Sequence, residues 1–156
     1  MSLKNILGIN PEFIRIREFE LQGQKFKVKV PNITESEYME KLVENPSTEL
    51  INEKYQKLLK PLLEKKEQFG ESDKIVFKDD DVVIDSISLK EIAINQCKTE
   101  LRILASFKLL IPQEGQTMDN LTYDDINSDI PFPIQLDIVK KIANIISPSY
   151  EDSKKN

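Results

Sequence analysis

The first patterned stretch of the chain alternates apolar and polar residues and predicts a β-hairpin. Over residues 25–30 every second residue is a lysine and the residues between them are apolar, which is the period of a strand with one buried face. Residues 14–21 also carry an apolar side, but their alternation slips between Ile16 and Phe19, which predicts a bulge. Gly23, which tolerates a positive φ, predicts the turn between the two strands.

Two amphipathic helices are predicted after the hairpin. Thr34 and Glu37 have the spacing of a capping box, so the first helix is expected to begin at Thr34 and to stop before Pro46. The second begins near Ser47 and carries an apolar stripe. Pro61 interrupts this pattern, either by kinking one helix or by standing in the first turn of another.

Two short β-prone runs come next, before a long helix. Residues 75–77 and 82–84 flank an acidic turn and predict a second small hairpin, or a single strand preceded by an acidic loop. Ser86 or Ser88 is suited to cap a helix over residues 89–110. Apolar residues recur through this helix at the helical period on a wide face, so we expect it to be the central helix of the core.

The remainder of the chain is a polar loop followed by one more helix. Residues 113–129 are rich in Asn and Asp and predict a loop, with one turn near Tyr123. Pro133 suits the first turn of a last helix, whose apolar residues continue to Ile146.

These elements predict an α+β protein, with an N-terminal β-hairpin and a mainly helical remainder. We expect a single domain over residues 1–149 and a flexible charged tail over residues 150–156. The net charge of −5 disfavours nucleic acid as a partner, because a duplex-binding protein needs a basic excess. No stretch has the length of a signal peptide's apolar region or of a membrane span, so we expect a cytoplasmic protein with no membrane partner.

Candidate catalytic chemistry is sparse. The 156 residues include no histidine, the commonest general base and metal ligand. The lone Cys97 lies in an apolar helical pattern and is predicted to be a buried, inert thiol. The acidic residues Asp79, Asp80, Asp81 and Asp85 lack the glycine of a calcium loop and are interpreted as a solvated turn in preference to a metal site. We therefore expect no enzyme, no catalytic residue and no cofactor, although the 27 acidic residues leave a small carboxylate-dependent enzyme as an alternative.

Two apolar features are candidates for partner binding. The first is a helical stripe spaced like two heptads of a helix-pairing seam. It packs either against the protein's own core, which we favour, or against a partner helix or a second copy. The second is the segment around Phe132, between two prolines, which is either a docking motif or, as we favour, the rigid start of the last helix. The candidate partner-binding residues are Ile51, Tyr55, Leu58, Leu62 and Phe132.

Several segments, taken in order, resemble tail assembly chaperones of long-tailed bacteriophages and prophages. A strand leads into a helix at Phe26-Lys27-Val28-Lys29-Val30-Pro31, and a second matching stretch runs from Asp81-Val82-Val83-Ile84-Asp85 through Ser88-Leu89-Lys90-Glu91-Ile92-Ala93. The third is Asp129-Ile130-Pro131-Phe132-Pro133-Ile134-Gln135, which leads into Ile142 to Pro148. The length, the acidity and the charged C-terminus fit as well.

The resemblance implies a non-enzymatic role. Chaperones of this family bind the tape measure protein, a very long and mostly helical chain, keep it soluble and help tail tube protein to polymerise around it. The resemblance therefore implies the tape measure protein and the tail tube protein as partners. A structural component of the virion, such as a tail connector-type subunit, is the alternative.

Overall fold

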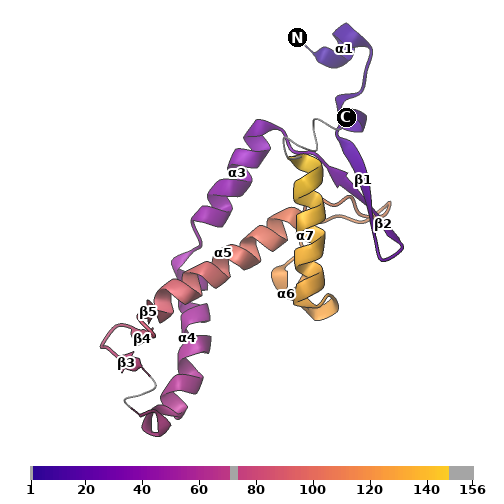
Figure 1. The fold of residues 1–156 in the computed structure, drawn as a ribbon. Helices are drawn as coiled ribbons and strands as arrows, with labels where there is room; N and C mark the ends of the chain where they lie inside the picture. The colour runs from indigo at the N-terminus through magenta and orange to yellow at the C-terminus, as the bar shows by residue number, and fades with distance from the viewer. Residues whose placement is uncertain (1, 71–73, 148–156) are drawn as a thin grey trace. The chain divides into compact units, whose positions relative to one another are not determined.

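The chain forms an α+β fold, as predicted, and the computed structural model describes residues 2–70 and 74–147 (Figure 1). The predicted tail over residues 150–156 lies outside the described residues. The helices are α1 (Leu3–Leu7), α2 (Pro11–Ile14), α3 (Ile33–Glu44), α4 (Thr48–Glu64), α5 (Leu89–Phe107), α6 (Tyr123–Asp129) and α7 (Phe132–Ile146), and a 3-10 turn, η1, spans Lys66–Gln68. The strands are β1 (Ile16–Leu21), β2 (Gln24–Lys29), β3 (Ile75–Phe77), β4 (Val82–Ile84) and β5 (Ile87–Ser88).

The fold consists of two compact units, each with its own hydrophobic core. Unit 1 comprises Met1–Met39 together with Ile103–Asn156, and unit 2 comprises Glu40–Arg102. The buried core of unit 1 consists of Val28, Ile103, Phe107, Ile126, Ile138 and Ile142. The buried core of unit 2 consists of Tyr55, Val82, Leu89 and Ala93.

The N-terminal hairpin of unit 1 is regular. Strands β1 and β2 pair antiparallel without a break from Ile16 opposite Lys29 to Leu21 opposite Gln24, so the predicted bulge is wrong. Gln22 and Gly23 both have positive φ, 53° and 76°, as a two-residue hairpin turn of the mirror-image type requires. The alternation slips at Ile16 because this side chain lies on the outer face with the charged residues, not on the core face with Phe19.

The outer edge of β2 binds a segment from much later in the chain. The N–H of Lys29 donates to the carbonyl of Leu109 at 2.9 Å, and the N–H of Ile111 donates to the carbonyl of Lys27 at 2.8 Å. This pairing draws residues 109–111 out of the helix. Helix α5 accordingly ends at Phe107, so the prediction of a helix to residue 110 is corrected.

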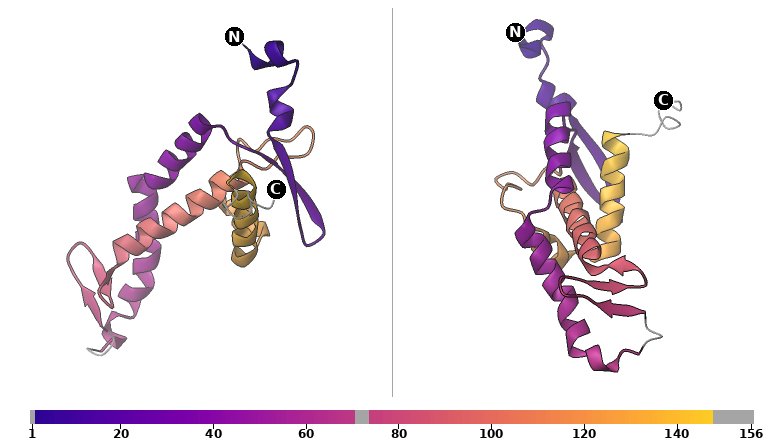
Figure 2. Two further views of the ribbon diagram at one scale, coloured as in Figure 1. Left: turned by 45° about the horizontal axis from the view of Figure 1, so that its top comes forward. Right: turned by 90° about the vertical axis from the view of Figure 1, so that its left-hand side faces the viewer.

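Helices α6 and α7 complete the core of unit 1, and α7 lies beside β1 (Figures 1 and 2). Residues 113–122 of the predicted loop contain no helix or strand, and the turn predicted near Tyr123 is the beginning of a longer helix, α6, which spans Tyr123–Asp129. Thr122 and Asp125 cap α6 reciprocally as a capping box, which was not predicted. Helix α7 has Pro133 in its first turn, as predicted.

Helices α3 and α4 use Asn and Ser caps. The side chain of Asn32 accepts from the N–H of Glu35 at 2.9 Å, so α3 begins at Ile33 and the predicted cap at Thr34 is corrected. The hydroxyl of Ser47 accepts from the N–H of Leu50, and α4 continues through Pro61 as one helix.

Unit 2 contains the predicted second hairpin and one strand more. Strand β3 pairs with β4, and β4 pairs with β5, all antiparallel. The β4–β5 turn places Asp85 and Ser86 at positive φ, 49° and 70°. Because this turn contains no glycine, the sequence gives no clear signal for β5.

Candidate interaction surfaces

The predicted stripe on α4 lies largely inside unit 2. Tyr55 is 9% exposed and belongs to the buried cluster, and Leu58 and Leu62 pack against that cluster. Ile51 is half-buried. The own-core interpretation therefore describes where Tyr55, Leu58 and Leu62 lie, whereas binding of a partner by this stripe stays a prediction.

Polar and charged groups surround Tyr55 at the edge of that cluster. Burial, followed by the nearby charges of Asp81 and Asp80, raises the pKa of the Tyr55 phenol. The ammonium of Lys90 lies 5.9 Å from the centre of the Tyr55 ring, within the range of a cation–π contact. These contacts give the tyrosine a structural role in unit 2.

The acidic turn before β4 stabilises unit 2 through the hydrogen bonds of Asp81. The carboxylate of Asp81 accepts from the N–H of Val82 at 2.8 Å, from the N–H of Lys90 at 3.2 Å and from the hydroxyl of Ser88. Burial raises the pKa of Asp81, but the hydrogen bonds from Ser88, Val82 and Lys90 outweigh it and the pKa is lowered overall. The carboxylate thus ties the turn before β4 to the first turn of α5. Over residues 2–70 and 74–147, no three His, Cys, Asp or Glu residues form a group that could hold a metal ion.

Phe132, the other predicted partner-binding residue, is exposed at the start of α7. Its side chain is 45% exposed, and Ile134 and Leu136 are 40% and 43% exposed. Phe132 and Leu136 are four residues apart and share a face of the helix. Gln135 faces the other way and is fully buried. Its amide donates to the carbonyl of Ile130 at 2.7 Å.

Sequence reasoning missed a group of exposed apolar residues in α1 and α2. Leu3, Ile6 and Leu7 are 60%, 55% and 59% exposed, and Phe13 and Ile14 are 72% and 57% exposed. None of the five belongs to either hydrophobic cluster. The signal was present in the spacing of the three residues of α1, which places them on one side of a helix.

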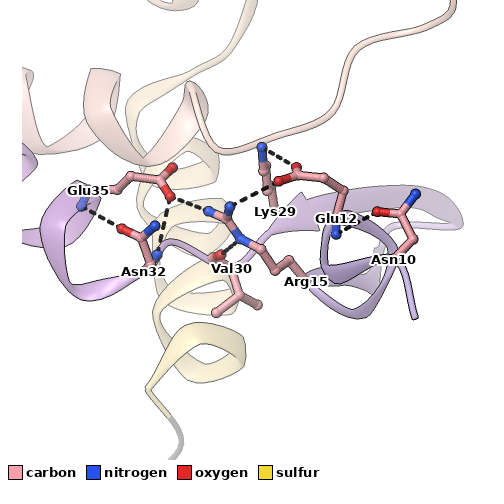
Figure 3. Close-up of polar contacts among 7 residues, drawn as sticks. All are labelled: Asn10, Glu12, Arg15, Lys29, Val30, Asn32 and Glu35. Atoms are coloured by element: carbon pink, nitrogen blue, oxygen red, sulfur yellow. Dashed lines mark hydrogen bonds and ion pairs between the residues drawn. The ribbon is translucent and has the colours of Figure 1, made fainter. Parts of the chain in front are cut away.

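A cluster of polar contacts holds the start of the hairpin between α2 and α3 (Figure 3). The guanidinium of Arg15 donates to the carbonyl of Val30 at 2.8 Å and also pairs with the carboxylates of Glu12 and Glu35. The ammonium of Lys29 lies 2.7 Å from the Glu12 carboxylate. The hydrogen bond and the charge of Lys29 hold the pKa of Glu12 below its usual value.

The Arg15 cluster fixes α2 to the hairpin and so fixes the backbone that carries Phe13 and Ile14. Glu35 also accepts from the backbone N–H of Asn32 at 3.4 Å, so one carboxylate serves both Arg15 and the cap of α3. Ile33, immediately after this cap, is 77% exposed. Ordered backbone in this part of unit 1 therefore carries several apolar side chains in water, which is unusual unless they meet a partner.

Comparison with known proteins gives no relative: no family model, no curated protein and no solved structure matches the chain. Within the described ranges, no helix is long and apolar enough to cross a membrane.

Proposed function

We propose that this chain is a tail assembly chaperone of a long-tailed bacteriophage or prophage. It acts in the cytoplasm of the host cell by protein–protein contacts and without chemistry. Its partners are the tape measure protein and the tail tube protein. The observation that carries the proposal is the row of exposed apolar residues on α1, Leu3, Ile6 and Leu7, and the three segments that resemble this family support it.

Exposed apolar helix faces suit the task of such a chaperone. A long helical protein with apolar seams aggregates unless other apolar surface covers those seams. A short helix such as α1, five residues long, offers a small contact that releases readily. Many copies bound along one long chain then hold it by avidity, and each copy leaves individually when tail tube protein arrives.

The test is co-expression with the tape measure protein that the proposal requires as a partner. We expect the chain to raise the soluble fraction of the tape measure protein and to co-purify with it. The variant L3Q/L7Q replaces two leucines that are 60% and 59% exposed, and we expect it to lower both readouts. The matched control L50Q/L63Q replaces two exposed leucines of α4, 43% and 51% exposed, and should leave both readouts unchanged.

Two results would count against the proposal. Unchanged solubility of the tape measure protein, with no complex recovered, would rule out the chaperone function. Recovery of the chain from purified virions by mass spectrometry, in stoichiometric amount, would instead identify a structural component, because a chaperone leaves the finished tail.

A further inference from the structure

Strand β1 pairs with β2 along one edge. The hydrogen-bond pattern of the hairpin shows which backbone groups of β1 point outward at its other edge. The backbone groups of Lys27 and Lys29 point away from β1, since they bond to residues 109–111 on the far side of β2. In an antiparallel pair, two directly opposite residues either bond to each other or both turn their backbone groups outward. Lys27 stands opposite Glu18 in the register, so the N–H and C=O of Glu18 point away from β2.

The same alternation applies two residues further along. Lys25 stands opposite Glu20, so the N–H and C=O of Glu20 also point outward. Among the described residues, no backbone hydrogen bond reaches these groups of Glu18 and Glu20. Strand β1 therefore presents a row of backbone donors and acceptors that can pair with another strand.

Along this edge the outer face of β1 carries Ile16 and the carboxylates of Glu18 and Glu20, and the inner face carries Arg17, Phe19 and Leu21. Glu18 and Glu20 are exposed, and neither belongs to an ion pair in the part of the chain that the structure describes. Between them, Phe19 points to the core face, where it stacks on Phe26 with ring centres 4.9 Å apart. An added strand would meet two carboxylates on one side and an aromatic ring on the other.

Strand β2 shows which sequence β1 pairs with. It places Lys25 and Lys27 directly opposite Glu20 and Glu18, with Phe26 between them opposite Phe19. Opposite charges on directly opposed residues stabilise an antiparallel pair, and like charges destabilise it. These opposed side chains form no ion pair within the hairpin, so the charges of Glu18 and Glu20 are left to attract a basic–apolar–basic segment at the other edge.

We propose that the open edge of β1 binds an extended segment of a partner protein that carries Lys or Arg at alternate positions, separated by apolar residues, and adds it as a strand. The basic side chains pair with Glu18 and Glu20, and the intervening apolar side chain packs beside Phe19. Backbone hydrogen bonds to Glu18 and Glu20 provide affinity, and the charges select the partner. This inference does not rest on the chaperone function, which concerns helical contacts of α1.

A second copy of this chain is a poor occupant. If two β1 strands pair antiparallel with the same faces aligned, Glu18 faces Ile16, Glu18 or Glu20 of the other copy, depending on the register. Glu18 therefore meets an apolar residue or a like charge and never a base, and the like-charged pairs destabilise the sheet. The charge of the edge therefore favours a basic segment from a different protein.

The test uses the full chain and a short acetylated peptide, Lys-Val-Lys-Val-Lys, with Glu-Val-Glu-Val-Glu as its control. We expect the basic peptide to slow hydrogen exchange of the Glu18 and Glu20 amides and to shift their NMR signals, and the acidic peptide to do neither. Unchanged exchange at both amides with saturating basic peptide would overturn the proposal.

Charge reversal tests the selectivity of the edge. E18K/E20K makes both side chains repel the basic peptide and should weaken peptide binding by about tenfold or more. It also opposes Lys27 and Lys25 of β2, so circular dichroism checks that the hairpin still folds. The matched control E37K/E114K changes the net charge equally at two exposed positions of the same unit, and should bind as the unchanged chain does. If both variants weakened peptide binding equally, the effect would come from net charge and not from the edge of β1, and the proposal would be overturned.

Removal of one outward N–H tests the backbone contact. E20P deletes the Glu20 N–H, which β2 does not use, and proline is tolerated at such an edge position. We expect E20P to abolish peptide binding and E20Q, which keeps the N–H, to weaken it only about threefold. Circular dichroism of both variants confirms folding. A dimer in sedimentation, with Glu18 and Glu20 amides protected in the absence of peptide, would overturn the proposal in favour of self-pairing.

Discussion

Two apolar stripes with similar helical spacing end in opposite environments. On α4, Tyr55, Leu58 and Leu62 pack in or against the core of unit 2, and Tyr55 is only 9% exposed. On α1, Leu3 and Leu7 are 60% and 59% exposed and belong to no cluster. Spacing shows that a helix has an apolar face, but the elements that fold against it decide whether the face is core or surface.

The largest effect on the free energy of unfolding is expected from a substitution in the buried stripe on α4. Y55A removes a ring from the core of unit 2 and should lower the free energy of unfolding by about 3 kcal/mol, because the cavity and the lost burial add. Y38A removes the same group from a position that is 65% exposed and should cost no more than about 0.5 kcal/mol. Urea unfolding followed by circular dichroism measures both. Equal costs would show that the two tyrosines do not differ in burial as described.

The same contrast between buried and exposed positions applies to two glutamine side chains, one of them on α7. Gln135 is 0% exposed and donates to the carbonyl of Ile130 at 2.7 Å. Q135L leaves that carbonyl without this donor and should cost about 2 kcal/mol. Q116L alters an exposed glutamine and should cost less than about 0.5 kcal/mol. Thermal unfolding ranks the two variants, and a Q135L protein as stable as the unchanged chain would mean that the buried hydrogen bond contributes nothing net.

A smaller effect is expected from the carboxylate that supports the buried stripe's cluster. Asp81 bonds to Ser88 and to the N–H of Lys90, on either side of the core residue Leu89. D81N should cost about 1 kcal/mol at neutral pH, since the amide is a weaker acceptor than the carboxylate. D79N, in the same turn, is the control and should be neutral within about 0.5 kcal/mol.

The pH dependence of the same variant gives an independent check. The pKa of Asp81 in the fold is lowered from its ordinary value of 3.8, so its stabilising effect is present above 3.8 and is lost as the pH falls through the lower folded value. D81N should therefore destabilise the protein at neutral pH and converge with the unchanged chain in acid. A difference that stays constant down to pH 2 would contradict the assigned role of the carboxylate.

Local patterns predicted much of the fold where the chain's neighbours in sequence are also its neighbours in space. The lysine alternation and Gly23 predicted the N-terminal hairpin, and Ser47 and Pro133 marked helix starts correctly. The predictions of helix ends are wrong where contacts with residues distant in sequence determine where the helix begins or ends. Both Asn32 and Thr34 are followed by a glutamate three residues later, and α3 begins after Asn32, where the Arg15 side chain engages that glutamate.

The end of α5 and the candidate surfaces were beyond sequence reasoning for the same reason. Residues 109–111 continue the apolar helical pattern, yet pairing with β2 takes them out of the helix. Tyr55 and Leu62 look like a seam for a partner, but β4 and α5 supply the residues that cover them. Flanking prolines mark Phe132 in the sequence, whereas α1 is only five residues long and carries no such marker beyond the spacing of its three apolar residues.

Substitutions in the exposed stripe on α1 should have the smallest effect on the free energy of unfolding and the largest effect on the exposed apolar surface. L3Q/I6Q/L7Q replaces three residues that are 60%, 55% and 59% exposed, so the free energy of unfolding should change by less than about 0.5 kcal/mol. The fluorescence of a dye that binds apolar surface should fall, because this row is exposed apolar surface. A loss of stability comparable to that of Y55A would mean that α1 packs against the rest of the chain in solution, and the contrast between the two stripes would then disappear.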